Sequence, residues 1–437
     1  MNSIIQFLKP LLSLALVLVQ VFNLFFSGKI FEQPVVDSGY SASLPTYERD
    51  AYRAELLSGG YYNSYWFEPL SLLTNRPHGE IEFNWGYCGL LSLTYKMSML
   101  DDSYIGKSEQ VVEGLDYFRR VVDRRFDGYS HSRALFKNGA TNGVSYDDNM
   151  WLARDLIGLY ELTNERKYLN RAVEIAEYII RAAFVDLDPQ IFRDYGFTVD
   201  NDTPLGGFYW DDRHDALHAC SNGPAIQLLA ALYRLTGNEL YLDKAVKSYN
   251  FLQYLVRPDG VFHDLMRFSK DSENNITGIL RPDGPPYSYN SGSPITGAVE
   301  LYRATGASKY LDTAKYWAAC ADTYFAKDSD VDGLKKYPSG NIWFNLILLN
   351  GYVALTPYDA ENTAVYIAHM QNSIDYAYDN YITRRSLLYG PSLPGDWING
   401  WGDQDQKDIW VLNASSQAEI YATLAIYQQS LDLTANN

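Results

Sequence analysis

The hydrophobic and polar positions along the chain repeat in a unit that predicts two helices. Three segments carry the clearest copies: LYELTNERKYLNRA from Leu159, LYRLTGNELYLDKA from Leu232 and LYRATGASKYLDTA from Leu301. Each begins with Leu-Tyr, continues through Thr and then Asn or Gly, and reaches Tyr-Leu and Ala. The copies start about 70 residues apart, a spacing that indicates repeated structural units.

Each unit is expected to fold as a helical hairpin. An apolar segment runs into Leu-Tyr, which predicts a helix that is buried on most of its faces. Thr-Gly or Thr-Asn then ends this helix, because Gly and Asn suit the left-handed conformation at a helix C-terminus. After a short turn, a second segment carries apolar residues on one face only, as an amphipathic helix does.

Weaker copies extend the array towards both ends of the chain. The further segments are Glu48–Leu57, Tyr87–Leu100 with Gly106–Phe126, Trp343–Leu355 with Ala360–Tyr381, and Ser415–Leu431. Apolar helices are expected to start near residues 86, 148, 222, 293, 342 and 415, and amphipathic helices near residues 48, 107, 166, 239, 308 and 360. Six such pairs predict an all-α fold, an (α/α)6 barrel forming one domain over residues 41–437. An open solenoid of hairpins is the alternative.

Residues 1–40 are expected to lie outside this domain. The segment Pro10–Phe26 is almost wholly apolar, follows Lys9 and precedes a Gly-containing break, which is the pattern of a signal peptide. Its length is close to the minimum for a membrane span, so an uncleaved signal-anchor is the alternative. Both forms predict a secreted or cell-surface protein that meets a membrane only through this segment.

Charge and composition restrict the class of ligand. The formal net charge is −17, which argues against a nucleic-acid partner because binding phosphates requires a basic face. Aromatic residues make up 15% of the chain, and aromatic rings near carboxylates suit sugars, with their apolar faces and rims of hydroxyl groups. The 3 cysteines are widely separated and form no C-x-x-C motif, so the sequence predicts neither a metal site nor a cofactor.

The long connections all precede the apolar helices, so they should meet at one end of the barrel. They are rich in Gly, Asn, Asp, Tyr and Trp, and loops on a rigid scaffold commonly carry function. The side chains expected to bind substrate at this end are Trp85, Tyr146, Trp151, Trp210, Asn222, Tyr289, Trp343, Trp397 and Trp401. The alternatives are loop packing for the aromatic rings and helix capping for Asn222.

Two adjacent carboxylic acids, Asp147 and Asp148, begin one of the apolar helices. Helix capping is one explanation, since Asp favours the first turn of a helix. The alternative is catalysis, because two carboxyl groups this close cannot ionise independently and one pKa should be raised. A protonated acid beside an ionised carboxylate is the pair that glycoside hydrolysis requires.

Two motifs here resemble those of glycoside hydrolase family 76. They are Tyr146-Asp147-Asp148 with Trp151, and Gly206-Gly207-Phe208-Tyr209-Trp210 followed by Ser221-Asn222-Gly223. The likeness covers most of residues 45–431. It implies an (α/α)6 barrel and retaining endo-α-1,6-mannanase activity on α-mannan or mannooligosaccharides, with Asp147 as nucleophile and Asp148 as general acid/base. The family often has Lys-Asn before its Ser-Asn element, where this chain has Leu217-His218-Ala219-Cys220.

Three other functions remain open on the sequence alone. A transglycosylase could use the same site to transfer mannan, as related fungal cell-wall enzymes do. Another (α/α)6 enzyme, such as an unsaturated-uronide hydrolase or a lyase, would act on acidic glycans, which the negative charge of this chain disfavours. A non-catalytic glycan-binding protein would keep the aromatic residues but would not need both Asp residues. In each case the protein is expected to be a monomer.

Overall fold

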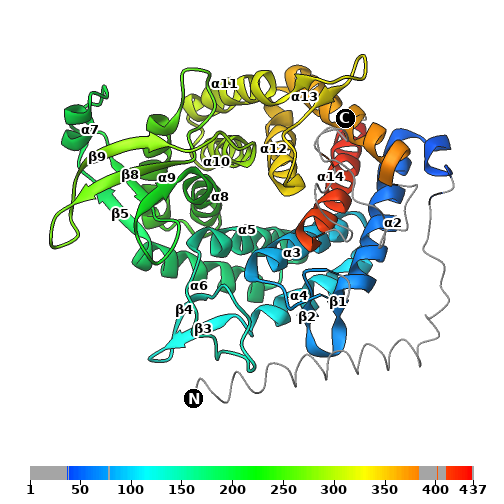
Figure 1. The fold of residues 1–437 in the computed structure, drawn as a ribbon, viewed down its shortest axis with the longest axis horizontal. Coiled ribbons are helices and arrows are strands. Elements are labelled where there is room, and N and C mark those ends of the chain that lie inside the picture. The colour runs from blue at the N-terminus through cyan, green and yellow to red at the C-terminus, as the bar shows by residue number, and fades with distance from the viewer. Residues whose placement is uncertain (1–36, 38, 77–78, 383–400, 402–409, 436–437) are drawn as a thin grey trace.

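Six helices form an inner ring and six more surround it (Figure 1). The computed structural model describes residues 37, 39–76, 79–382, 401 and 410–435. The inner helices are α3 (Asn84–Leu100), α5 (Tyr146–Thr163), α8 (Ala219–Thr236), α10 (Tyr289–Thr305), α12 (Ile342–Leu355) and α14 (Val411–Ala435). The outer helices are α2 (Thr46–Tyr65), α4 (Ile105–Leu115), α6 (Arg166–Ala182), α9 (Glu239–Leu252), α11 (Ser308–Phe325) and α13 (Ala360–Ala377).

The inner ring is closed. Each inner helix contacts the next one along the chain, and α14 contacts both α3 and α2, so the last inner helix packs against the first inner and the first outer helix. An open solenoid would leave these two ends apart. The fold is therefore the (α/α)6 barrel that the repeat predicts, and the observed helix starts follow the predicted ones to within a few residues.

The junction of the repeated hairpins has the predicted geometry. Helices α5, α8 and α10 end at Asn164, Gly237 and Gly306, all in the left-handed conformation. In α5, the Thr163 hydroxyl donates to the carbonyl of Leu159 and accepts the N–H of Glu165. The same pair of bonds recurs at the ends of α8 and α10. The repeated Thr therefore joins each inner helix to the start of its outer partner.

Short strands and one further helix lie in the long connections that lead to inner helices. The strands are β1 (Trp66–Phe67), β2 (Leu72–Leu73), β3 (Arg119–Val122), β4 (Arg125–Tyr129), β5 (Phe184–Leu187), β6 (Leu205–Phe208), β7 (Ala216–His218), β8 (Leu265–Lys270), β9 (Ile276–Asp283), β10 (Lys327–Asp328) and β11 (Lys335–Lys336). Helix α7 (Pro189–Tyr195) lies between β5 and β6. All pairings of these strands are antiparallel.

One expected helix is much shorter than predicted. The sequence suggested a helix over Gly106–Phe126, but α4 ends at Leu115 and the hairpin β3–β4 follows. The turn residues Asp123 and Arg124 both have positive φ. That is the geometry of a type I′ hairpin turn, and it cannot occur inside a helix.

The inner helices approach closely where they carry glycine. A Cβ atom added to Gly292 of α10 would lie 2.2 Å from the carbonyl oxygen of Ile347 in α12. On the opposite side of this contact, a Cβ atom on Gly351 would lie 2.8 Å from the Gly292 oxygen. Because these neighbours are backbone atoms, they cannot rotate away as a side chain can. Glycine at these two positions therefore sets the spacing between α10 and α12.

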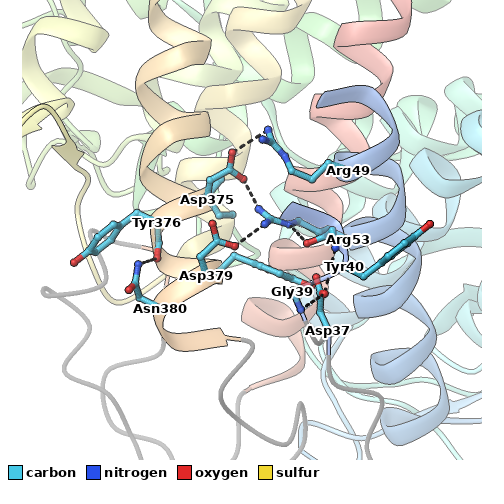
Figure 2. Close-up of polar contacts among 12 residues, drawn as sticks. Asp37, Gly39, Tyr40, Arg49, Arg53, Asp375, Tyr376, Asp379 and Asn380 are labelled. Atoms are coloured by element: carbon cyan, nitrogen blue, oxygen red, sulfur yellow. Dashed lines mark hydrogen bonds and ion pairs between the residues drawn. The ribbon is translucent and has the colours of Figure 1, made fainter. Parts of the chain in front are cut away.

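A buried cation helps to close the ring. Figure 2 shows Arg53 of α2 between Asp375 of α13 and Asp379, with N–O distances of 2.7 and 2.6 Å. The Arg53 side chain is only 1% exposed, and its guanidinium lies 4.1 Å from the centre of the Tyr378 ring. Asp37 accepts a hydrogen bond from the Tyr378 hydroxyl at 3.1 Å. The chain entering the barrel is thus bonded to the end of α13 and to the residues that directly follow it.

None of the helices in the described ranges is long and apolar enough to cross a bilayer. The segment Pro10–Phe26, on which the export prediction rests, lies outside those ranges. The proposal of a signal peptide or signal-anchor over residues 1–40 therefore remains a prediction from sequence.

We expect Gly292→Ala to destabilise the protein by about 2–3 kcal/mol, because the added methyl group meets backbone that has no room to move. Gly59→Ala is the matched control. Gly59 lies inside α2 and a Cβ atom there would meet nothing within 4 Å, so this change should stabilise by about 0.5–1 kcal/mol. Urea unfolding measures both changes, and equal effects would contradict the close approach.

We expect Arg53→Met to lower the free energy of unfolding by about 3 kcal/mol, because it removes a buried guanidinium that forms two ion pairs and leaves Asp375 with Arg49 as its one remaining ion-pair partner among the described residues. Arg281→Met removes the exposed ion pair with Asp283 and should cost less than about 1 kcal/mol. Denaturant titrations of both variants make the comparison. If Arg53→Met lowers the free energy of unfolding as little as Arg281→Met does, the buried cation contributes little to ring closure.

Candidate active site

Asp147, the second residue of α5, is held by three hydrogen-bond donors. Its Oδ2 atom accepts from Trp210 Nε1 at 2.9 Å and from the Cys220 thiol at 3.5 Å, and its Oδ1 accepts from the backbone N–H of Asp148 at 3.0 Å. The residue is 8% exposed. Three donors around one carboxylate stabilise its ionised form and fix its orientation.

Asp148 has different surroundings. Its side chain is partly exposed, and within the described residues no donor forms a hydrogen bond with its carboxyl group. Its backbone oxygen accepts from the thiol of Cys88 in α3 at 3.4 Å, which brings α3 against the first turn of α5. The Asp147 carboxylate is therefore held by donors, whereas the Asp148 carboxyl group is left free to exchange a proton.

The electrostatics separate the two acids in the same direction. Burial raises the pKa of Asp147 to about 6, and its hydrogen bonds and the nearby His218 limit the rise. Burial, followed by the negative charges of Asp147 and Glu82, raises the pKa of Asp148 well above its usual range. Between these two pKa values, Asp147 is ionised and Asp148 keeps its proton. The arrangement can therefore supply a nucleophile and an acid together.

Trp210 connects the acid pair to the neighbouring connection. Besides the ring contact to Asp147, its carbonyl oxygen accepts from the Tyr146 N–H at 2.7 Å. The Tyr146 hydroxyl lies 3.1 Å from His214 Nε2, and burial raises the pKa of Tyr146 to about 12. Tyr146 itself is only 3% exposed, so it offers little surface to a ligand, and its contacts hold the start of α5 in place.

Asn222 and Asn149 occupy the same position, the fourth residue, in α8 and α5. The Asn222 amide accepts from Phe208 N and donates to the carbonyls of Phe208 and His218. Asn149 makes the equivalent three bonds to Tyr129 and to Ser145. Asn222 has no exposed surface, so its side chain fixes the connection against the helix start.

Aromatic rings gather at the starts of the other inner helices. Trp85 lies 5.7 Å from Trp343 and 5.3 Å from Trp410, while Tyr289 stacks on Phe344 at 4.0 Å. Trp85, Trp210 and Tyr289 are partly exposed, as are Phe344 and Trp410.

The other aromatic residues that the sequence predicted to bind substrate are buried or lie outside the described residues. Trp151 and Trp343 are each 2% exposed and pack against one another at 4.8 Å, so they offer little surface to a ligand. Trp401 has no exposed surface and donates to Ser373 Oγ, and none of its contacts with described residues is to the acid pair. Trp397 lies outside the described residues.

Further polar groups at this end form contacts that the sequence did not predict. His218 Nδ1 lies 3.5 Å from Asp264 Oδ2, and the His218 ring lies 5.2 Å from the Trp210 ring. Asp264 also accepts from Asn290 Nδ2 at 2.8 Å. His218 stands in the element that departs from the pattern of family 76. Its partner Asp264 is nearly fifty residues away in the chain, so the sequence could not reveal this pair.

Comparisons with known proteins give one consistent result. The model of glycosyl hydrolase family 76 matches residues 111–431. Mannan endo-1,6-alpha-mannosidase DCW1 of Saccharomyces cerevisiae is 24% identical over 140 residues, and that of Candida glabrata is 22% identical over 166 residues. These matches cover 31% and 37% of this chain, and they span only 30% and 35% of the two relatives.

Solved structures share the fold over most of the chain. The family 76 mannosidase Bt3792 of Bacteroides thetaiotaomicron has a TM-score of 0.71 and 23% identity, covering 87% of this chain and 99% of its own. An inactive variant of an α-1,6-mannanase of Salegentibacter, in complex with α-1,6-mannotriose, has a TM-score of 0.63 and 22% identity, with coverage of 86% and 99%. Because the family model matches well over half of the residues, the chain belongs to glycosyl hydrolase family 76 and to the glycoside hydrolases as an enzyme class.

Proposed function

We propose that the protein is a retaining endo-α-1,6-mannanase that uses Asp147 as nucleophile and Asp148 as general acid/base. The observation that carries this proposal is the unequal environment of the two acids. Three donors hold Asp147, whereas Asp148 faces other negative charges and accepts no hydrogen bond from the described residues. A double displacement requires this division of roles.

In the first step, Asp148 gives its proton to the glycosidic oxygen as the bond between that oxygen and the anomeric carbon breaks. An oxygen of Asp147 forms a bond to the same carbon, and the released end of the mannan departs as an alcohol. In the second step, Asp148 accepts a proton from water, and the water oxygen attacks the anomeric carbon. The ester bond to Asp147 breaks, which regenerates both acids and retains the configuration.

The choice of α-1,6-mannan rests on the named relatives together with the site. Both yeast relatives are described as mannan endo-1,6-alpha-mannosidases, and the Salegentibacter enzyme is bound to an α-1,6-mannotriose. In this chain, the partly exposed rings of Trp85, Trp210 and Tyr289 are the proposed platforms for mannose residues. His218 would donate to a substrate hydroxyl where other family members often carry Lys-Asn.

The place of action is also a proposal. The apolar segment Pro10–Phe26 supports export, with the catalytic domain outside the cell or at its surface. An α-mannan outside the cell would be reached there without transport.

We expect Asp147→Asn and Asp148→Asn each to lower hydrolysis of linear α-1,6-mannan roughly a thousandfold or more. On α-1,6-mannobiosyl fluoride, whose leaving group needs no proton, Asp148→Asn should still form the glycosyl-enzyme. Asp147→Asn should not. Product analysis and mass spectrometry of the intact protein give these readouts.

Asp188→Asn is the control for that experiment. Asp188 caps the start of α7 by accepting from Gln190 N, and Asn can make the same capping bond. This variant therefore tests whether exchanging Asp for Asn at a helix start by itself affects activity. It should remain active, and all variants should keep the helical circular dichroism of the parent. Activity in Asp147→Asn would overturn the assignment of the nucleophile. Products longer than the substrate would favour the transglycosylase alternative.

We expect kcat/KM to rise with pH through a limb near pH 6, because Asp147 must lose its proton to act and its pKa is raised to about 6. Trp210→Phe removes a donor that stabilises the ionised form, so this limb should move to higher pH by up to about one unit. Trp85→Phe should change substrate binding without moving the limb. An unchanged limb in Trp210→Phe would contradict the role of the indole N–H.

A further inference from the structure

The hairpin of β8 and β9 carries a short motif that takes no part in the proposed reaction. Its residues Asn275-Ile276-Thr277 form an Asn-x-Thr sequence, which is the acceptor motif for N-linked glycans. The pattern recurs at Asn201, followed by Asp and Thr, and at Asn413, followed by Ala and Ser. A motif this short also occurs by chance, so the surroundings of each asparagine decide whether it can carry a bulky glycan.

The hairpin exposes both side chains that the motif at Asn275 requires. Strand β9 begins at Ile276, which is partly buried and packs against the hydrophobic core. Asn275 and Thr277 lie on either side of it in the chain and are both exposed. Successive side chains of an extended segment point to opposite faces. The amide of Asn275 and the hydroxyl of Thr277 are therefore both open to solvent while the residue between them faces the protein.

Asp271 holds the turn of this hairpin and orients the Asn275 amide. Its Oδ1 atom accepts from the backbone N–H groups of Glu273 and Asn275 at 2.8 and 2.9 Å, and its Oδ2 atom accepts from Asn275 Nδ2 at 3.1 Å. The Nδ2 atom carries two hydrogens, and this bond uses one of them. Because a glycan replaces one hydrogen only, a glycosylated Asn275 can keep its bond to Asp271.

The acceptor lies at the end of the hairpin that is farther from the acids. Leu265, at the start of β8, pairs with His218, whereas Lys270, at the end of β8, pairs with Ile276. At about 3.3 Å per residue, β8 separates these two ends by roughly 16 Å. Figure 1 shows the hairpin at the edge of the molecule beside α7, away from the centre of the inner ring. A glycan on Asn275 would therefore leave the approach to the acid pair clear.

Asn413 has the opposite surroundings. It is the third residue of α14 and is only 1% exposed. Its Oδ1 atom accepts from the backbone N–H of Ile342 at 2.9 Å, so this amide joins the starts of α12 and α14. A glycan attached to it would force apart two closely packed inner helices. The closed barrel therefore cannot carry a glycan at this position.

Asn201 is exposed, in the connection between α7 and β6. Its motif residue Thr203 is followed by Pro204, and a residue before proline is restricted to extended conformations by steric clash. The backbone here is less free to fit a transferring enzyme than the backbone at Asn275. The inference is accordingly based on Asn275 and Asn413.

We propose that Asn275 is an acceptor site for an N-linked glycan and that Asn413, which has the same motif, is not. The donor is an oligosaccharide carried on a lipid diphosphate. A bond forms between Asn275 Nδ2 and the anomeric carbon of the oligosaccharide, and the bond from that carbon to the diphosphate oxygen breaks. The lipid diphosphate leaves with the bonding electron pair, and Nδ2 gives one proton to the transferring enzyme. This inference rests on the proposed place of action, because such transfer requires an exported chain.

The test is to produce the full chain in a eukaryotic host, both as it stands and preceded by a secretion signal of that host. Peptide-N-glycosidase in ¹⁸O-labelled water converts each glycosylated Asn to an Asp that carries ¹⁸O, and mass spectrometry of peptides locates the label. We expect the label at Asn275 and none at Asn413. A secreted chain with unmodified Asn275 would overturn the proposal, as would a label at Asn413 in folded protein.

Thr277→Ala and Thr277→Ser are the matched variants. The first removes the hydroxyl that the motif requires and should abolish the glycan on Asn275, whereas the second keeps a hydroxyl and should retain the glycan. Asn275→Gln should lose the glycan as well. All three should keep the helical circular dichroism of the parent, because the changed side chains are exposed. Equal modification of Thr277→Ala and the parent would contradict the assignment.

The same samples separate this inference from the proposed function. If the full chain stays in the cytosol without a glycan, but is modified at Asn275 when the host signal precedes it, only the proposed place of action fails. If the glycosylated chain does not cleave α-1,6-mannan, only the proposed activity fails. If the secreted chain cleaves mannan and carries no glycan at Asn275, the inference about Asn275 fails.

Discussion

Two carboxyl groups on consecutive residues, one buried and the other partly exposed, cannot easily be ionised together, and the site of this protein is organised around that constraint. Burial disfavours the charged form of each acid, and each charge disfavours the other. Within the described ranges, the structure resolves the conflict by placing hydrogen-bond donors at Asp147 and none at Asp148. Trp210, Cys220 and a backbone N–H stabilise charge on Asp147, so the proton remains on Asp148.

Such an arrangement depends on the closed ring of inner helices. The donors to Asp147 come from the second residue of α8 and from the connection before it, while Cys88 of α3 contacts Asp148 from the other side. These parts meet only because neighbouring helices start at the same end of the barrel. Close packing at Gly292 and the buried guanidinium of Arg53 help to hold the ring closed.

The connections contribute as much to the site as the helices do. Asn149 and Asn222 each tie a connection to the helix that follows it, through bonds to backbone on both sides. The aromatic side chains divide by depth. Trp151 and Trp343 fill the interior, whereas Trp85, Trp210 and Tyr289 retain surface that a sugar ring could cover. Aromatic residues near the starts of the inner helices therefore either fill the core or keep surface at the site.

The sequence by itself determined the barrel and the place of the acid pair. Leu-Tyr followed by Thr-Gly or Thr-Asn is a local signal, since the end of a helix is set by the conformational preference of one or two residues. The two adjacent Asp residues can likewise be recognised directly in the sequence. The strands β3 and β4 were missed because the same apolar residues also fit a helical period.

Only the tertiary structure decided which groups surround the acids. Glu82 accepts a hydrogen bond from Trp410 although the two are more than three hundred residues apart, as Arg53 and Asp375 are, and nothing local to one predicts the other. The burial of each tryptophan likewise depends on which neighbours cover it. Charge, exposure and hydrogen bonding at the site arise from contacts between distant segments, and these exist only once the ring has closed.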